Sequence, residues 1–276
     1  MLRLPPPPEL ADLVVHFWVP EWDLPPGRVE RQLVLTYPVV NLVVEPDAVT
    51  VHGPHTSVSH RDLSGRGWAV GALLRPAAVP AVLATTGSDP AQHPTKAPAT
   101  PSLSAPASAA SLVDGQRRLD EPRLLAEVSQ AMRPGAGDRQ ARAAAVLGHW
   151  ISERKQAPDR DGQLANAGFD LIEADPGVTT VTELARRLAV STRTLQRISL
   201  RHNGFTPGAL IRRRRLQGAA DRLRQDPDAD LAALAHELGY ADHAHLTREF
   251  RHVLGVTPSD YRSGSTGSAG SSSRST

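Results

Sequence analysis

Two short segments of this 276-residue chain carry side chains that can hydrogen-bond base edges and phosphates. The first set is Ser191, Thr192, Arg193, Thr194, Gln196 and Arg197. The second set is Asp242, His243, His245, Arg248 and Arg251, together with Ala244, which has no hydrogen-bonding side chain but takes an exposed position in the same segment. Arg and Gln can form paired hydrogen bonds with base edges, and Arg, Thr and His reach phosphate oxygens. The first expectation is therefore a surface that contacts double-stranded DNA at two places.

The distribution of charge points to a polyanionic partner for the same part of the chain. Residues 178–262 hold 14 Arg and 9 acidic residues, a net charge of +5, whereas residues 1–177 hold 16 basic and 20 acidic residues, a net charge of −4. A charged face is usually just solvated, so this asymmetry indicates nucleic acid only in combination with the motifs.

The same apolar pattern precedes both polar segments and predicts what positions them. LARRLAV begins at Leu184 and LAHELGY begins at Leu234, each with apolar residues at positions i, i+1 and i+4. That spacing buries one stripe of a short helix, and Ser191 or Asp242 can cap the helix that follows. The apolar residues expected under this next helix are Leu195 and Ile198 in one unit, and Leu246 and Phe250 in the other. Each segment thus has the pattern of a helix-turn-helix whose second helix enters the major groove.

The two units are joined by a segment with clear helix signals. Thr206 can cap, Pro207 suits the first helical position and Pro227 ends the run, which predicts one helix over Pro207–Gln225. At 1.5 Å per residue its length is about 28 Å, close to the roughly 34 Å of one DNA turn. One chain could thus place two recognition helices in successive major grooves, with Arg213 of the spacer among the DNA contacts. The alternative is a plain helical bundle whose Arg-rich helix is solvated.

Residues 178–262 resemble the DNA-binding domain of the AraC/XylS family of bacterial transcription regulators. The resemblance is carried by ELARRLAVSTRTLQR, GFTPGALIRRRRLQGA and LAALAHELGYADHAHLTREFRHVLGVTPSDYR. It implies a seven-helix domain, promoter binding by the recognition-helix residues named above, and activation through RNA polymerase. The chain departs from the family at Ala189, where Gly is usual, and at Ser199, where a core Phe is common. A polar Ser199 predicts a less filled core in the first unit.

The first half of the chain has a different pattern. Between residues 14 and 70, short β-branched apolar runs such as LVVHFWV and VVNLVVE alternate with Pro and Gly clusters, which predicts a small antiparallel sheet or barrel. Residues 76–115 are rich in Ala, Pro, Ser and Thr, which predicts loose or disordered chain. Helical patterns return after residue 121, and the Gly/Ser-rich tail is expected to be flexible.

We therefore expect an α+β fold in four parts. Residues 1–115 form a β-rich sensor domain with a disordered-looking end, and residues 116–177 form linking or dimerisation helices. Residues 178–262 form an all-α domain with two helix-turn-helix units, and residues 263–276 are the tail. The family resemblance implies that the sensor domain is cupin-like.

A small effector could lie in the β-rich domain, because aromatic walls with few polar groups suit small ligands. The candidate lining residues are Trp22, Tyr37, His52 and Trp68, with Trp18 and Arg75 as further members. Taken singly, each is better explained as part of the core. Metal-binding barrels place two His one residue apart with an acid following, and His52, His55 and His60 lack that spacing. We expect no metal and no cofactor.

The composition narrows the class of protein further. The chain has no cysteine, which excludes disulfides, thiolate metal sites and cysteine nucleophiles. DNA-repair alkyl acceptors share the AraC-like fold but need cysteine thiolates, and a barrel oxygenase is disfavoured by the His spacing. We therefore expect no catalytic residue and no enzyme.

The expected setting is the cytoplasm, without a membrane partner. The start of the chain lacks a signal-peptide pattern, and no run approaches the ~18 apolar residues of a membrane span. A homodimer and control by a small effector are both open, as is a regulator that acts by its abundance alone.

Overall fold

The computed structural model describes residues 2–34, 38–57, 59–84, 108–135, 137–154, 157–226 and 228–262. Tyr37, Pro227, residues 85–107 of the Ala/Pro-rich stretch and the tail after residue 262 lie outside these ranges. The predictions of a lining role for Tyr37, of disorder between residues 85 and 107 and of a flexible tail therefore stay predictions.

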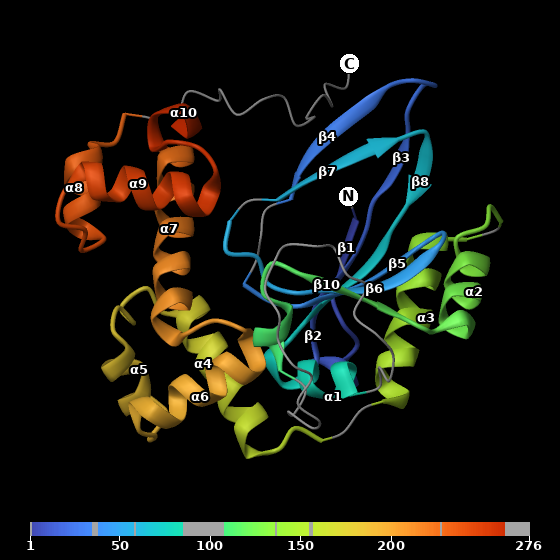
Figure 1. Ribbon diagram of the computed structural model, residues 1–276, viewed down its shortest axis with the longest axis horizontal. Helices are drawn as coiled ribbons and strands as arrows, with labels where there is room; N and C mark the ends of the chain where they lie inside the picture. Colours follow the sequence, from blue (N-terminus) through green and yellow to red (C-terminus); the bar gives the residue numbers. More distant parts are fainter. Residues whose placement is uncertain are drawn as a thin grey trace, which may run out of the picture.

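An antiparallel six-stranded sheet forms the centre of the N-terminal half, in the order β1-β2-β9-β5-β6-β10 (Figure 1). Its strands are β1 (Leu2–Leu4), β2 (Val14–Val19), β9 (Val70–Leu74), β5 (Asn41–Glu45), β6 (Ala48–His52) and β10 (Gln116–Leu119). Two smaller sheets pair β3 (Glu21–Asp23) with β8 (Arg66–Trp68), and β4 (Val29–Val34) with β7 (Ser59–Ser64). The β-rich first half is thus confirmed, but its sheet continues through β10, beyond the boundary expected at residue 115.

One face of the large sheet is apolar and covered by helices. Alternate residues of β2 and β5, such as Phe17 and Leu42, are buried on this face. α2 (Pro122–Ala131) and α3 (Arg139–Glu153) pack over it through residues such as Leu147. Gly148 allows the close approach of α3, because a Cβ there would lie 3.2 Å from Phe17 Cζ. These two helices, expected as linkers, are part of the N-terminal core.

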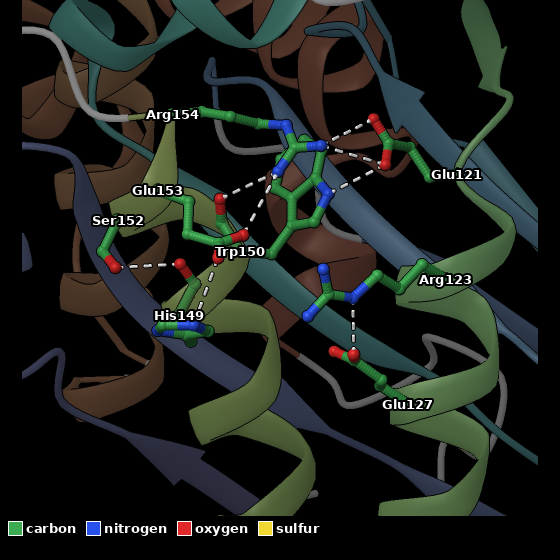
Figure 2. Close-up of polar contacts among 8 residues, drawn as sticks. All are labelled: Glu121, Arg123, Glu127, His149, Trp150, Ser152, Glu153 and Arg154. Atoms are coloured by element: carbon green, nitrogen blue, oxygen red, sulfur yellow. Dashed lines mark hydrogen bonds and ion pairs between the residues drawn. The ribbon is translucent and has the colours of Figure 1, made fainter.

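The end of α3 is tied to the start of α2 by Trp150, Arg154 and Glu121 (Figure 2). Trp150 Nε1 donates to Glu121 Oε2 at 3.1 Å, and Arg154 Nη2 donates to both carboxylate oxygens at 3.1 Å. The Arg154 guanidinium also lies 4.0 Å above the Trp150 ring. These contacts fix the pair of helices as a unit on the sheet, while the dimerisation role expected for them stays a prediction.

The described ends of the Ala/Pro-rich stretch are helical, so the expectation of loose chain is wrong for them. η2 (Pro76–Ala78) leads into α1 (Val79–Ala84), and η3 (Ala109–Leu112) precedes β10. Val79, Leu83 and Leu112 are buried in the N-terminal core. Helices of three to six residues that bury a few side chains leave little periodic pattern in a sequence.

The C-terminal half is helical, as predicted. Its helices are α4 (Arg160–Ala174), α5 (Val181–Arg187), α6 (Thr192–Asn203), α7 (Pro207–Gln225), α8 (Leu231–Glu237), α9 (His243–Leu254) and α10 (Pro258–Arg262). One apolar core lies under α5, α6 and the start of α7, and a second lies under the end of α7, α8 and α9. The two cores lie at opposite ends of α7 (Figure 1). Among the described residues, none of the helices has the length and apolar character needed to cross a bilayer.

Candidate nucleic-acid interface

Both predicted helix-turn-helix units form, and each recognition helix has the predicted cap. Ser191 Oγ accepts a hydrogen bond from Thr194 N at 3.1 Å, and Asp242 Oδ1 accepts one from His245 N at 2.6 Å. Each of these helices also ends at a left-handed glycine, Gly204 with φ 78° and Gly255 with φ 77°. Ser191 and Asp242 therefore hold the first turns of α6 and α9, whose free N–H groups favour a nearby anion.

The turns inside the two units share one geometry although their sequences differ. The equivalent hydrogen bonds are Val190 N to Ala185 O at 3.0 Å and Tyr240 N to Ala235 O at 2.8 Å. The residue before the donor is left-handed in both, Ala189 with φ 52° and Gly239 with φ 66°. Ala189 thus takes the conformation that glycine takes in the second unit, and its Cβ makes that conformation unfavourable.

The recognition helices bury their apolar residues and expose their polar ones. Leu195, Ile198, Leu246 and Phe250 are buried as predicted. The exposed members of the predicted set are Ser191, Thr192, Arg193, Gln196, Arg197, Asp242, His243, Ala244, Arg248 and Arg251. Thr194 and His245 are half-buried, and the ring of His245 meets that of Tyr240 edge-on at 5.2 Å. The spacing of polar residues along both helices therefore places them on open surface.

The N-terminal ends of the two recognition helices, α6 and α9, lie on one side of the molecule (Figure 1). The C-terminal end of α6 lies against the N-terminal domain, where Ser108 Oγ donates to the carbonyls of Leu200 and Arg201, both at 3.5 Å. The N-terminal end of α6 consequently points away from the sheet, and α8 with the start of α9 lies on that same side of α7 (Figure 1). A duplex approaching from this side would meet the first turns of both helices.

Arg213 does not lie on that side, so its prediction as a DNA contact is wrong. Its side chain is buried, and Nη2 donates to the carbonyl oxygens of His55 at 2.5 Å and Thr56 at 2.6 Å. Its guanidinium lies 4.7 Å above the Phe205 ring, and burial lowers its pKa. Arg213 therefore joins the spacer helix to the N-terminal domain, through the loop that follows β6.

Arg212 and Arg215, which the sequence analysis did not single out, lie on the side where the two units face each other. Together with Val181 and His245 they line a hollow between the start of α5 and the start of α9. Arg212 Nη1 is 3.5 Å from Glu249 Oε2 in the same hollow. The run of four Arg in α7 gave no sign of which members face outward, because helical periodicity spreads consecutive residues around the axis.

Ser199 does not leave a gap in the core of the first unit. Its side chain is buried, and its hydroxyl donates to Phe205 O at 2.7 Å. Phe205 itself packs into the same core. The polar residue is therefore hydrogen-bonded, and the expectation of a less filled core is not supported by this contact.

Comparison with known proteins bears on both halves of the chain. Residues 184–264 match a family model described as a helix-turn-helix domain, and residues 2–93 match a domain of unknown function. An AraC-like transcription regulator of Streptomyces antibioticus is 41% identical over 97 residues, which is 35% of this chain and 32% of that protein. The HTH-type transcriptional activator RhaS of Pectobacterium carotovorum is 35% identical over 79 residues, 29% of this chain and 28% of that protein.

Residues 184–264 thus form a helix-turn-helix domain similar to that of AraC-type regulators. The match lies in the helix-turn-helix domain, and it spans about a third of the length of these relatives. Among solved structures, ToxT of Vibrio cholerae aligns with a TM-score of 0.43 at 9% identity over 89% of this chain and 97% of that one. A form of ToxT bound to an unsaturated fatty acid aligns with a TM-score of 0.41 at 13% identity, over 92% and 98% of the two chains.

The aromatic residues predicted to line a pocket in the N-terminal half do not form one cluster. In the β3–β8 pair, Trp22 lies opposite Gly67 and Trp68 lies opposite Glu21. Neighbouring residues of a strand point to opposite faces, so Trp22 and Trp68 cannot line the same cavity. Of the further candidates, Arg75 donates to Asp170 of α4 at 2.5 Å and so serves the contact between the domains.

A different polar set gathers around His52, on the sheet face away from α2 and α3. His52 pairs with Asn41 in register, and its Nε2 is 2.8 Å from Thr50 Oγ1. Asn41 Oδ1 in turn accepts from Trp18 Nε1 at 3.2 Å. Burial, with smaller contributions from Arg61 and His55, lowers the pKa of His52 to about 4. The polar Asn41 at the head of the apolar run NLVVE was the sequence signal for this face.

No group of three or more His, Asp or Glu side chains with the arrangement of a metal site occurs within the described ranges. His52 is hydrogen-bonded to Thr50 within the sheet, and His55 Nδ1 lies 3.7 Å from Asp114 Oδ1.

Proposed function

We propose that this protein is a transcription regulator that binds double-stranded DNA in two successive major grooves. The observation that carries the proposal is the pair of capped recognition helices at opposite ends of α7, each with its polar residues exposed. α7 has 19 residues, a length of about 28 Å against roughly 34 Å for a DNA turn. The net charge of +5 on residues 178–262 supports a polyanionic partner.

Within this proposal the residues have separate roles. Arg193 and Gln196 on α6, and His243 and Arg248 on α9, read base edges, because they are exposed near the starts of the recognition helices. Arg212 and Arg215 face the phosphates that cross between the two grooves, in place of the buried Arg213.

The N-terminal domain is proposed to control this binding. The sheet face that holds Trp18, Asn41, Thr50 and His52 offers hydrogen-bonding groups to a small polar effector. Activation through RNA polymerase, action as a homodimer in the cytoplasm and the absence of enzyme activity complete the proposal. They rest on the similarity of the helix-turn-helix domain to that of AraC-type regulators.

Selection of binding sites from a random DNA library by the full chain, followed by affinity measurements at several salt concentrations, tests the proposal. We expect a two-part site and a log–log salt slope of several units, since each phosphate contact contributes about 0.9. Arg193→Ala and Gln196→Ala should relax the preference at particular base pairs, at about 1–3 kcal/mol each. Arg215→Gln should weaken binding to all sequences alike.

The matched control is Arg28→Gln, because Arg28 is an exposed residue near the start of β4 in the N-terminal domain. It should leave both affinity and preference unchanged. A binding constant indifferent to salt, or the same selected site for the wild type and both α6 variants, would contradict the proposal.

A further inference from the structure

Helix α4 lies between the two domains and is fixed to both. On one side the buried Asn166 donates from Nδ2 to Asp12 O at 2.8 Å and accepts from Ala77 N at 3.0 Å. On the other side Leu171 and Ile172 pack into the core of the first helix-turn-helix unit. The start of α4 is thereby held at a fixed place beside the recognition helix α6.

At that place Asp161 forms an ion pair with Arg197, a residue of the recognition helix α6. Arg197 Nη1 donates to Asp161 Oδ2 at 2.8 Å, and Nη2 donates to Oδ1 at 3.3 Å. Both terminal nitrogens of the guanidinium are engaged, although 57% of the Arg197 side chain is exposed. A planar guanidinium reads the O6 and N7 atoms of guanine with the same kind of paired donors.

We propose that Asp161 is a specificity-determining residue, because its ion pair with Arg197 keeps that side chain from contacting the base pairs. The inference rests on the proposed DNA-binding function and adds to it a competitor that lies outside the matched helix-turn-helix domain. In its presence the base pairs under α6 are read by Arg193 and Gln196, and Arg197 contributes little.

Repulsion between Asp161 and the DNA phosphates is what keeps Arg197 paired with Asp161. An exposed ion pair is worth only about 0–1 kcal/mol, so DNA could displace Asp161 if nothing else opposed it. The displaced carboxylate would, however, lie unpaired close to the phosphates, and like charges repel. The hydrogen bond from Arg197 holds the pKa of the Asp161 carboxyl below its usual value, so Asp161 is charged at neutral pH. Breaking the pair therefore exposes a full negative charge at the DNA surface.

The test is the Asp161→Asn substitution in the full chain, which removes the charge and keeps the shape. The cap of α4 is Asp159, whose Oδ1 accepts from Gly162 N at 2.7 Å, so the helix start is left in place. We expect binding about three- to tenfold tighter at low salt and a salt slope steeper by about one unit. Site selection should show a new preference at the base pair that Arg197 reaches.

Two further variants separate this effect from the loss of any acidic group. Asp170→Asn makes the same charge change on α4, at a carboxylate that is bonded to Arg75 and not to α6. It should change affinity by less than about twofold, since distant surface charges are screened by salt. Arg197→Ala alone should weaken binding, because it leaves the Asp161 carboxylate unpaired near the phosphates. Combined with Asp161→Asn, it should bring affinity back to about the wild-type level without the new base preference.

Equal affinity of Asp161→Asn and the wild type would overturn the inference while leaving the proposed function standing. So would an equal gain in Asp170→Asn, or a double variant of Asp161→Asn with Arg197→Ala that binds as tightly as Asp161→Asn alone. Failure of the wild-type chain to bind any DNA with sequence preference would overturn the proposed function and this inference with it. Circular dichroism and thermal unfolding of each variant confirm that the comparison is made between folded proteins.

Discussion

Ala189 shows at the scale of one residue how two similar units can differ. It holds a φ of 52° in the first turn, where the second unit has Gly239 at 66°. The sequence comparison with the AraC/XylS family identifies this departure but not its consequence. The consequence is local backbone strain, because the left-handed region costs an alanine roughly 1–2 kcal/mol and a glycine almost nothing.

We predict that Ala189→Gly stabilises the protein by about 0.5–1 kcal/mol, since relief of strain exceeds the extra entropy of an unfolded glycine. Urea unfolding of the full chain measures the change. Ala233→Gly is the matched control, because Ala233 is exposed near the middle of α8 and a glycine there should destabilise by about 1 kcal/mol. Destabilisation by both substitutions would show that Ala189 is not strained.

At the same scale, local chemistry decided which site residues could be predicted. Ser191 and Asp242 were recognisable because a capping side chain precedes an apolar stripe in the sequence. The buried position of Arg213 was not recognisable, because nothing in a run of four consecutive Arg residues indicates which one is buried. The pairing of Arg197 with Asp161 joins residues 36 positions apart on different helices, so no local pattern indicates it.

At the scale of elements, α7 was predicted to the residue and the N-terminal sheet was not. Thr206 and Pro207 mark the start of α7, and the observed helix is Pro207–Gln225. The runs of β2 and β5 were recognised as strands, but β9 lies between them in the sheet. Strand order depends on contacts between distant segments, which alternation within one strand does not encode.

The length of α7 leads to a prediction about the whole element. Its first half packs in the core of the first unit through Leu210 and Ile211, and its second half packs in the second core through Leu216 and Leu223. Two residues inserted between these halves would turn the second unit by roughly 200°, at 100° per residue. The recognition helices would then face different sides of a duplex, and specific binding should be lost while both cores remain folded.

A gel shift on the selected site, with circular dichroism to confirm folding, measures the effect of the insertion. The control is the same insertion after Arg262, where α10 ends, and it should leave binding intact. Retained specific binding by the folded α7 insertion would mean that the two units do not act together on one DNA face.

At the scale of the whole molecule, the first helix-turn-helix unit is attached to the N-terminal domain and the second is carried by α7. Arg213 bonds the loop after β6, and His202 lies buried with Nδ1 3.0 Å from Pro76 O. Thr56 of that loop is held in turn by Asp114, through its N–H and its hydroxyl at 2.7 Å each. The loop and α7 are therefore joined at Arg213.

The last prediction tests Arg213 as the joint between the domains. In Arg213→Met the carbonyls of His55 and Thr56 lose a charged donor in a buried position, so we expect destabilisation by about 2–4 kcal/mol in urea unfolding. Arg212→Met is the matched control, since 53% of its side chain is exposed and its removal should cost less than about 0.5 kcal/mol. Under conditions where both variants are folded, the salt slope of DNA binding should fall by about one unit for Arg212→Met and stay unchanged for Arg213→Met. The reverse pattern, a reduced slope and wild-type stability in Arg213→Met, would indicate that Arg213 contacts the DNA and does not join the two domains.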